Sequence, residues 1–170
     1  MSGLADGQGC RIRRVRERDL TEILEIEETA FTNPYPLGYL RFLAKANPET
    51  FLVAEGVDRL RGYIIADIRN RNEGHIISIA VSKDDRRKGV ARALIEEVGS
   101  VFREFEVEVV KLEVRVSNHS AIKLYESMGY RQVGMMLGYY RDGEDAIIMS
   151  LGMGDVHYSG PDRRGSTMKM

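Results

Sequence analysis

The sequence predicts an α/β fold built on a mixed sheet, with about seven strands and four helices. Short apolar runs separated by turn-forming residues fill residues 51–81, a pattern typical of an antiparallel meander. Helical patterns then alternate with strands, and strand–helix–strand connections of that length imply parallel pairing. A final strand follows the turn RDGED and returns the sheet to antiparallel pairing.

The expected strands and helices follow one another without an internal linker or repeat. The expected strands are Arg11–Val15, Phe51–Ala54, Tyr63–Ile68, His75–Val81, Val109–Val116, Tyr130–Leu137 and Ala146–Leu151. The expected helices are Leu20 to about Phe31, Leu37–Ala46, Gly89–Phe105 and Ser120–Met128. Asp19 and Glu22 have the spacing of an N-terminal capping box for the first helix. The prolines of Thr32–Pro36 end that helix.

Length and composition indicate one soluble domain with a substantial core. The chain has 170 residues, of which 43% are apolar, and its formal net charge is −1. We therefore expect neither a nucleic-acid nor a membrane partner, since there is no excess of basic residues and no apolar run of spanning length. Without a recognisable signal peptide, a cytoplasmic protein is expected, as a monomer or small homo-oligomer.

Both ends of the chain are rich in glycine and polar residues. We expect flexible tails at residues 1–10 and 153–170, with the folded domain over residues 11–152. The single cysteine, Cys10, falls in the first tail, so no intrachain disulfide can form. Its place in a flexible segment also argues against a role as nucleophile.

Three consecutive basic residues precede the third expected helix, in the stretch Arg86-Arg87-Lys88-Gly89-Val90-Ala91. Helix N-termini already carry partial positive charge, so basic residues are unfavourable there unless an anion binds. Free backbone N–H groups, a glycine and nearby basic side chains together form a typical phosphate site. The alternative is a solvated run of charge on a loop.

A carboxylate lies on the fifth expected strand, which the topology makes central. Alternation places Leu112, Val114 and Val116 on one face and Lys111, Glu113 and Arg115 on the other. Because both faces of a central parallel strand are covered, Glu113 is expected to line a cleft. The alternative is a solvated strand face.

Four motifs, taken together and in order, resemble the GNAT N-acetyltransferase superfamily over about residues 11–152. They are NPYP, IISIAVSKDDRRKGVARALIEEV, LEVRVSNHSAIKLYESMGY and GYYRDGEDAIIMSL. The resemblance is nearest to the branch that acetylates protein N-termini, the ribosomal-protein alanine N-acetyltransferases and their archaeal relatives. It implies a central sheet splayed at a parallel strand pair, acetyl-CoA as cosubstrate and CoA as product. Protein or peptide N-termini are the implied partners, with ribosomal and nascent chains as candidates.

The resemblance also implies which residues bind the cofactor. Backbone N–H groups near the start of the third helix would hold the pyrophosphate, and the edge of Ile79–Val81 would pair with the pantetheine arm. Asn118 would contact that arm, or cap the following helix, or do both. The implied cofactor residues are Ile79, Ala80, Val81, Arg86, Arg87, Lys88, Gly89, Val90, Ala91, Arg92, Asn118 and Tyr125.

The implied catalytic residues are Glu113, Tyr125 and His75. Glu113 occupies the position of the general base, acting directly or through water, and Tyr125 that of the acid that protonates the leaving thiolate. His75 would hold a water together with Glu113, or would be a turn-end histidine without a role. Tyr125 has the alternative of a core aromatic residue. A His/Glu pair is weak support for a metal, and we expect none.

Tyr35, Tyr139 and Tyr140 are the expected substrate-binding residues, which would hydrogen-bond the substrate backbone; the alternative is aromatic packing in turns. Transfer would be direct, since no Ser/His/Asp set is evident. The oxyanion would be stabilised by a strand N–H near Val81. Two other functions stay open at this point: a GNAT enzyme acting on lysine or a small amine, and a non-catalytic coenzyme A-binding module.

Overall fold

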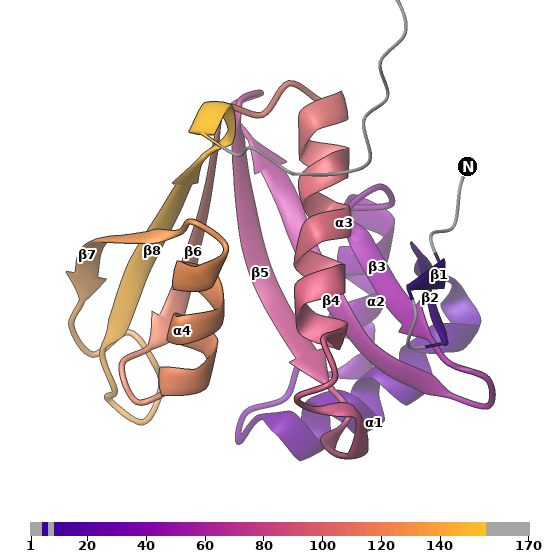
Figure 1. The fold of residues 1–170 in the computed structure, drawn as a ribbon. Helices are drawn as coiled ribbons and strands as arrows, with labels where there is room; N and C mark the ends of the chain where they lie inside the picture. The colour runs from indigo at the N-terminus through magenta and orange to yellow at the C-terminus, as the bar shows by residue number, and fades with distance from the viewer. Residues whose placement is uncertain (1–4, 7–8, 156–170) are drawn as a thin grey trace, which may run out of the picture.

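The computed structural model describes residues 5–6 and 9–155, which form one mixed sheet and its covering helices (Figure 1). The strands are β1 Ala5–Asp6, β2 Cys10–Arg14, β3 Phe51–Glu55, β4 Leu60–Arg69, β5 Glu73–Val81, β6 Val109–Arg115, β7 Arg131–Met136 and β8 Ala146–Gly152. The α-helices are α1 Leu20–Ala30, α2 Leu37–Ala46, α3 Val90–Glu104 and α4 His119–Ser127. The strand order is β1-β2-β3-β4-β5-β6-β8-β7.

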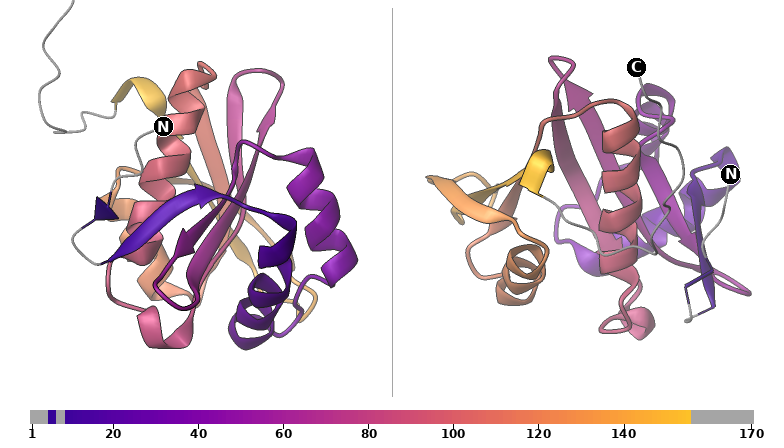
Figure 2. Two further views of the ribbon diagram at one scale, coloured as in Figure 1. Left: turned by 90° about the vertical axis from the view of Figure 1, so that its right-hand side faces the viewer. Right: turned by 45° about the horizontal axis from the view of Figure 1, so that its top comes forward.

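The helices cover the sheet from both sides, with α1 and α2 on one face and α3 on the other (Figure 2). Among the strands that the structure describes, only β5 and β6 pair in parallel, and α3 makes the crossover between them. All other pairings are antiparallel. The predicted order of antiparallel, parallel and again antiparallel pairing is confirmed. Strand β7 does not pair with β6, because β8 lies between them.

The expected elements are all present, with ends that differ by a few residues. The sheet has an eighth strand, because the two residues of β1 pair with Cys10 and Arg11. The placement of Cys10 in a flexible tail was wrong: it begins β2 and is 5% exposed. The remainder of the expected N-terminal tail at 1–4 and 7–8, and residues 156–170 of the C-terminal one, lie outside the described residues. Among the described helices, none is long and apolar enough to cross a membrane.

The predicted capping box at the start of α1 does not form. Asp19 makes no side-chain cap. Its carboxylate instead accepts two hydrogen bonds from the Arg13 guanidinium, at 2.7 and 2.9 Å, and one from the Arg16 backbone N–H. Glu22 accepts from the backbone N–H of Leu60 at 2.8 Å. Both carboxylates therefore tie α1 to the sheet. Asp19 pairs with Arg13 of β2 and Glu22 binds the first residue of β4, so neither caps the helix.

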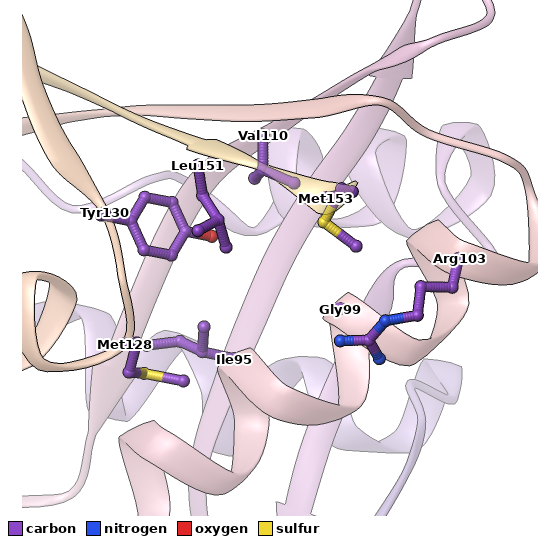
Figure 3. A pocket seen from close by; sticks show the side chains of 8 residues that line it. All are labelled: Ile95, Gly99, Arg103, Val110, Met128, Tyr130, Leu151 and Met153. Carbon is purple, nitrogen blue, oxygen red and sulfur yellow. The ribbon is translucent and has the colours of Figure 1, made fainter. Parts of the chain in front are cut away.

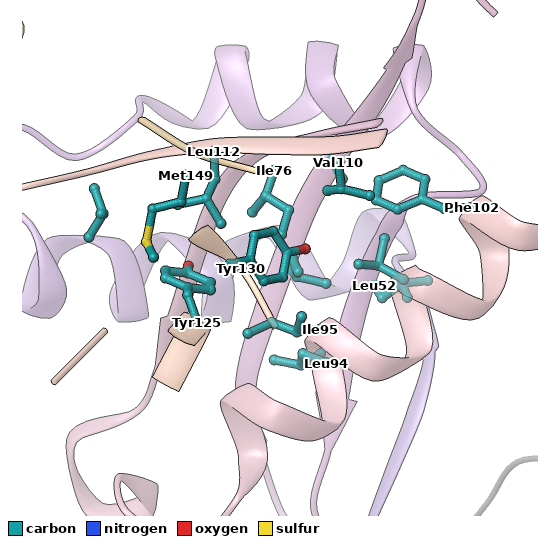
Figure 4. Close-up of a cluster of buried hydrophobic side chains, with 14 of the residues drawn as sticks. Leu52, Ile76, Leu94, Ile95, Phe102, Val110, Leu112, Tyr125, Tyr130 and Met149 are labelled. Carbon is teal, nitrogen blue, oxygen red and sulfur yellow. The ribbon is translucent and has the colours of Figure 1, made fainter. Parts of the chain in front are cut away.

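Strand alternation divides the apolar side chains between two cores. On the α3 side, Leu52 and Leu112 pack with the apolar stripe of the helix (Figure 4). That stripe consists of Val90, Leu94, Ile95, Val98 and Phe102. Ile64 belongs to the same core. On the α1 side, Phe51, Val53 and Tyr63 pack with residues of α1 and α2. Helix α4 joins the first core through Tyr125.

The parallel strands β5 and β6 lie side by side at one end and diverge toward the other (Figure 1). Their pairing covers Glu73–Ile76 against Val109–Leu112 and then stops. The register of β4 against β5 shifts at the same level, leaving Ile77 as an extra residue in β5. Such a bulge bends its strand. The predicted splay is thus present, and it begins beside Ile77.

A small pocket of about 10 Å³ lies between α3 and the paired end of the sheet (Figure 3). It is lined by Ile95, Gly99, Arg103, Val110, Met128, Tyr130, Leu151 and Met153. Gly99 contributes no side chain to this contact, and a Cβ added there would meet no atom within 4 Å.

Gly99→Ala is expected to stabilise the fold by about 0.5–1 kcal/mol, because alanine removes the conformational cost of glycine within a helix. Urea denaturation of both proteins measures the difference. Gly74→Ala is the matched control: its Cβ would come within 2.8 Å of the Phe102 ring, so it should destabilise. A lower midpoint for Gly99→Ala would contradict the open space at this position.

Candidate active site

A cleft of about 720 Å³ opens where β5 and β6 diverge. Its walls come from the α1–α2 loop, both diverging strands, α4 and the β7–β8 loop. The lining residues are Glu27, Ala30, Phe31, Thr32, Asn33, Tyr35, Ile76, Ile77, Ser78, Ile79, Leu112, Glu113, Val114, Arg115, Asn118, Ala121, Tyr125, Tyr139, Tyr140, Arg141 and Asp142. The cleft therefore reaches helices on both faces of the sheet.

Glu113 lies on β6 one residue beyond the last pair with β5, and its side chain is 21% exposed. His75 Nε2 is 2.7 Å from Glu113 Oε2. The hydrogen bond from His75 lowers the pKa of the Glu113 carboxyl, and burial acts in the opposite direction. Glu113 is therefore ionised at neutral pH. His75 is buried within β5, so it is not a turn-end residue.

Tyr125 is 5% exposed, and its ring packs edge-to-face against Tyr130 at 5.5 Å. It belongs to the α3-side core and also lines the cleft. Burial raises the pKa of the Tyr125 phenol, so the hydroxyl keeps its proton at neutral pH. Asn118 caps α4, since its Oδ1 accepts from the Ala121 backbone N–H at 3.3 Å. It lines the cleft as well.

Three tyrosines line the cleft: Tyr35 on the α1–α2 loop, and Tyr139 and Tyr140 on the β7–β8 loop. Burial raises the pKa of Tyr35 to about 12. Tyr139 and Tyr140 pack edge-to-face at 5.0 Å. The Arg115 guanidinium lies 4.0 Å from the centre of the Tyr140 ring. This cation–π contact links the loop to the strand that carries Glu113.

The β7–β8 loop has a further attachment that the sequence did not indicate. Arg115 Nη1 lies 2.8 Å from Asp142 and 2.8 Å from Glu144. Glu144 also accepts from the backbone N–H of Ser117 at 3.0 Å. These contacts hold the loop, and Tyr139 with it, beside the cleft. Alternation along β6 indicated only that Arg115 shares a face with Glu113.

Glu27 is a second cleft carboxylate that sequence reasoning missed. It is 1% exposed and lies in the last turn of α1. It accepts from the Tyr35 backbone N–H at 3.0 Å and from the hydroxyl of Tyr63, and Ser78 Oγ is 3.4 Å away. The sequence feature that could have indicated this carboxylate is its place, as a glutamate, on the apolar stripe of the first helix. Its hydrogen bonds fix the loop that carries Tyr35.

The loop before α3 has the form of an anion site. Gly89 and Arg87 have positive φ angles of 81° and 62°, and no side chain caps the helix. A Cβ on Gly89 would meet no atom within 4 Å, so the space beside the helix start is open. The side chains of Arg86, Arg87 and Lys88 are exposed around it. Backbone N–H groups and basic side chains of this kind fit a phosphate or pyrophosphate group.

A buried carboxylate supports this loop from behind. Asp85 precedes the basic run and is 4% exposed. Arg59 Nη1, on the β3–β4 hairpin, is 2.5 Å from Asp85 Oδ2, and Arg61 Nε is 3.8 Å from Oδ1. Arg86 Nε donates to the Val81 carbonyl at 3.3 Å. The sequence showed Asp85 only as part of a charge run.

The cleft brings together seven of the expected site residues: Tyr35, Ile79, Glu113, Asn118, Tyr125, Tyr139 and Tyr140. The other expected residues surround it. His75 contacts Glu113, while Ala80 and Val81 continue β5 toward the basic loop. Arg92 lies in the first turn of α3 and donates to Ser127 Oγ of α4 at 2.7 Å. Within the described residues, no group of three or more His, Cys, Asp or Glu side chains could hold a metal ion.

Comparison with known proteins gives a consistent result. Residues 20–130 match the Acetyltransferase (GNAT) family. An uncharacterised N-acetyltransferase of Methanocaldococcus jannaschii is 41% identical, with 81% of this chain and 88% of the relative covered. The N-alpha-acetyltransferase of Sulfurisphaera tokodaii is 36% identical, with 85% and 93% covered.

Two solved structures are similar in fold and sequence. Ard1 from Thermoplasma volcanium superimposes with a TM-score of 0.82 at 30% identity, covering 85% of this chain and 97% of that one. The ribosomal-protein-S18-alanine N-acetyltransferase from Escherichia coli gives 0.74 at 30% identity, with 87% and 96% covered. The chain therefore belongs to the GNAT acetyltransferase family and is an acetyl-CoA-dependent N-acetyltransferase.

Proposed function

We propose that the chain transfers the acetyl group of acetyl-CoA directly to the free α-amine of protein N-termini. The single observation that carries this proposal is the cleft that passes between β5 and β6. It joins Tyr125 and Asn118 on the α4 side to Tyr35 and Tyr139 on the other. Two substrates entering from opposite faces of the sheet would meet beside Glu113.

The α4 side suits the cofactor. The basic loop would hold the pyrophosphate through backbone N–H groups from about Arg87 to Arg92, with Arg86 and Lys88 nearby. Beyond Ile76, the β5 edge is no longer paired with β6, so Ile79–Val81 has backbone groups available for the pantetheine amides. Asn118 lies in the cleft wall where that arm would pass. Acetyl-CoA supplies the activated acetyl thioester.

Glu113 is the proposed base, acting directly or through a water molecule. Its ionised carboxylate can accept the amine proton as the new bond forms. An α-amine has a pKa of about 7.7–8.0, against about 10.4 for lysine, so deprotonating lysine costs roughly 3.4 kcal/mol more. A carboxylate with a lowered pKa is a weak base, and it is better matched to an N-terminus.

Tyr125 is the proposed acid. Its buried hydroxyl keeps its proton at neutral pH and lines the cleft, so it can donate to the leaving thiolate. A backbone N–H at the free edge near Val81 would stabilise the oxyanion. No covalent enzyme intermediate is needed.

Tyr35, Tyr139 and Tyr140 are proposed to hold the substrate backbone. Glu27 fixes the loop of Tyr35, and Arg115 fixes the loop of the other two, so both walls are preorganised. Hydrogen bonds to the backbone suit substrates of varied sequence. The named activities of the Sulfurisphaera and Escherichia relatives support protein N-termini, those of ribosomal proteins among them, as the substrate class. Nascent chains are proposed as a further source of such N-termini.

Peptides with a free α-amine and one internal lysine should be acetylated only at the N-terminus, because only that amine is substantially neutral near pH 8. Mass spectrometry of a panel starting with Ala, Ser, Met-Leu and Met-Glu checks this and shows the preferred first residue. The control panel has the α-amine blocked. Acetylation of the blocked peptides would instead establish a lysine acetyltransferase. Transfer to neither panel, with acetyl-CoA bound, would favour a small-amine substrate.

Glu113→Gln should lower kcat by about 10²-fold or more, because the amide cannot accept the amine proton. The dissociation constant of acetyl-CoA should stay near that of the wild type. In the wild type, the lowered pKa keeps Glu113 ionised from pH 5 to 8, so the rate should follow only the amine over that range. Steady-state kinetics across a pH series test both statements. Equal rates for the two proteins would remove Glu113 as base.

Gly89→Val should weaken acetyl-CoA binding at least about ten-fold. Valine is strained at a φ of 81°, and its side chain would occupy the open space beside the helix N-terminus. Isothermal titration calorimetry measures the effect. Gly38→Val in α2 is the control, since a Cβ there also meets nothing but φ is not positive. An unchanged constant for Gly89→Val would exclude this loop as the phosphate site.

A further inference from the structure

The proposed base is the last of three side chains that line up across three neighbouring strands. Asp67 on β4 is the cross-strand partner of His75 on β5, and His75 is level with Lys111 on β6. Glu113, two residues beyond Lys111, lies on the same face of its strand. The order in space is therefore Asp67, His75, Glu113, with the imidazole between two carboxylates.

The contact at one end of this row defines a proton position. His75 Nε2 and Glu113 Oε2 are 2.7 Å apart. An ionised carboxylate only accepts hydrogen bonds, so Nε2 of the ring carries the proton and donates it. This contact uses one ring nitrogen and leaves Nδ1 for another partner.

The other end of the row is open. His75 Nδ1 and Asp67 Oδ1 are 3.7 Å apart, and within the part of the chain that the structure describes neither atom has a hydrogen-bond partner. Both atoms are buried, and the histidine side chain is only 10% exposed. Buried polar atoms are almost always paired. Two facing buried atoms without partners therefore indicate a contact that closes when Nδ1 carries a proton, since a carboxylate oxygen only accepts hydrogen bonds.

Asp67 is held in place from its outer side. Arg69 Nε donates to Asp67 Oδ2 at 3.1 Å, which leaves Oδ1 directed at the imidazole. Lys111 Nζ lies 3.1 Å from Glu73, so that cation is already paired. The charged and titratable groups around His75 are Asp67 and Arg69 from β4, Glu73 from β5, Lys111 and Glu113 from β6, and Tyr139 from the β7–β8 loop.

We propose that Asp67 is a positioning residue, which acts through the His75 ring to keep Glu113 oriented toward the cleft. With protons on both ring nitrogens, Nε2–H faces Glu113 and Nδ1–H faces Asp67, so rotation of the ring would lose both contacts. A closure of under about 1 Å brings Nδ1 and Asp67 within hydrogen-bond distance. The inference rests on the proposed role of Glu113.

A double-mutant cycle tests this role. Asp67→Asn should lower kcat about ten-fold with the KM for acetyl-CoA unchanged, as is typical of groups that orient a functional side chain. In a His75→Ala background, the same change should have no further effect, because its route to Glu113 is gone. An equal loss in both backgrounds, or a loss confined to KM, would overturn the proposal. Asp58→Asn, at the exposed β3–β4 turn, is the matched control and should change nothing.

A second measurement does not depend on the variants folding. The chain has three histidines, so ¹⁵N NMR of the wild type can resolve the ring nitrogens of His75. Protons on both ring nitrogens are expected, and a ring with a proton on one nitrogen alone would overturn the role of Asp67. If Glu113→Gln keeps full activity, the proposed role of Glu113 as base fails. If Glu113→Gln is inactive but the cycle shows no coupling, only the role of Asp67 fails.

Discussion

The parallel pairing of β5 and β6 ends after Ile76 and Leu112, and the functional geometry depends on that interruption. Backbone N–H and C=O groups in a protein interior require partners. Where two central strands separate, their facing edges become binding surface, for water or for a ligand with amide groups. The bulge at Ile77 bends β5 away at this level. Each diverging strand then places residues along the resulting cleft: Ile79 from β5, and Glu113 and Arg115 from β6.

The opening does not separate the sheet into two units, because one apolar core spans both halves. Leu52 and Ile64 on one side of the opening and Leu112 and Met149 on the other belong to the same cluster. At the paired end, the Phe102 ring lies against Gly74 so closely that no Cβ would fit. The sheet is therefore tightly packed at its paired end and open at the end where β5 and β6 diverge.

Buried and half-buried carboxylates hold the loops and side chains that form the proposed active site. Burying a charge is costly unless it is paired or hydrogen-bonded. Asp85 is paired with Arg59 behind the basic loop, Glu27 binds the backbone of the Tyr35 loop, and Glu113 accepts from His75. Asp67 differs, since one of its oxygens is paired with Arg69 while the other faces the imidazole without a hydrogen bond. Because buried charges otherwise have partners, the unpaired oxygen of Asp67 indicates that this residue has a role beyond stability.

The sequence by itself determined the order of the elements and the chemistry of the loop before α3. Apolar periodicity and turn residues are local signals, so α2 was expected at its observed bounds, Leu37–Ala46. Alternation along β6 likewise placed Glu113 on the opposite face from Leu112. Tertiary structure decided what no local pattern contains. The tertiary structure places β8 between β6 and β7, and it pairs Asp19 with Arg13 in place of the expected helix cap. It also brings Asp67, His75 and Glu113 into one row across three strands. Contacts between distant strands depend on register and burial, and these are properties of the whole sheet.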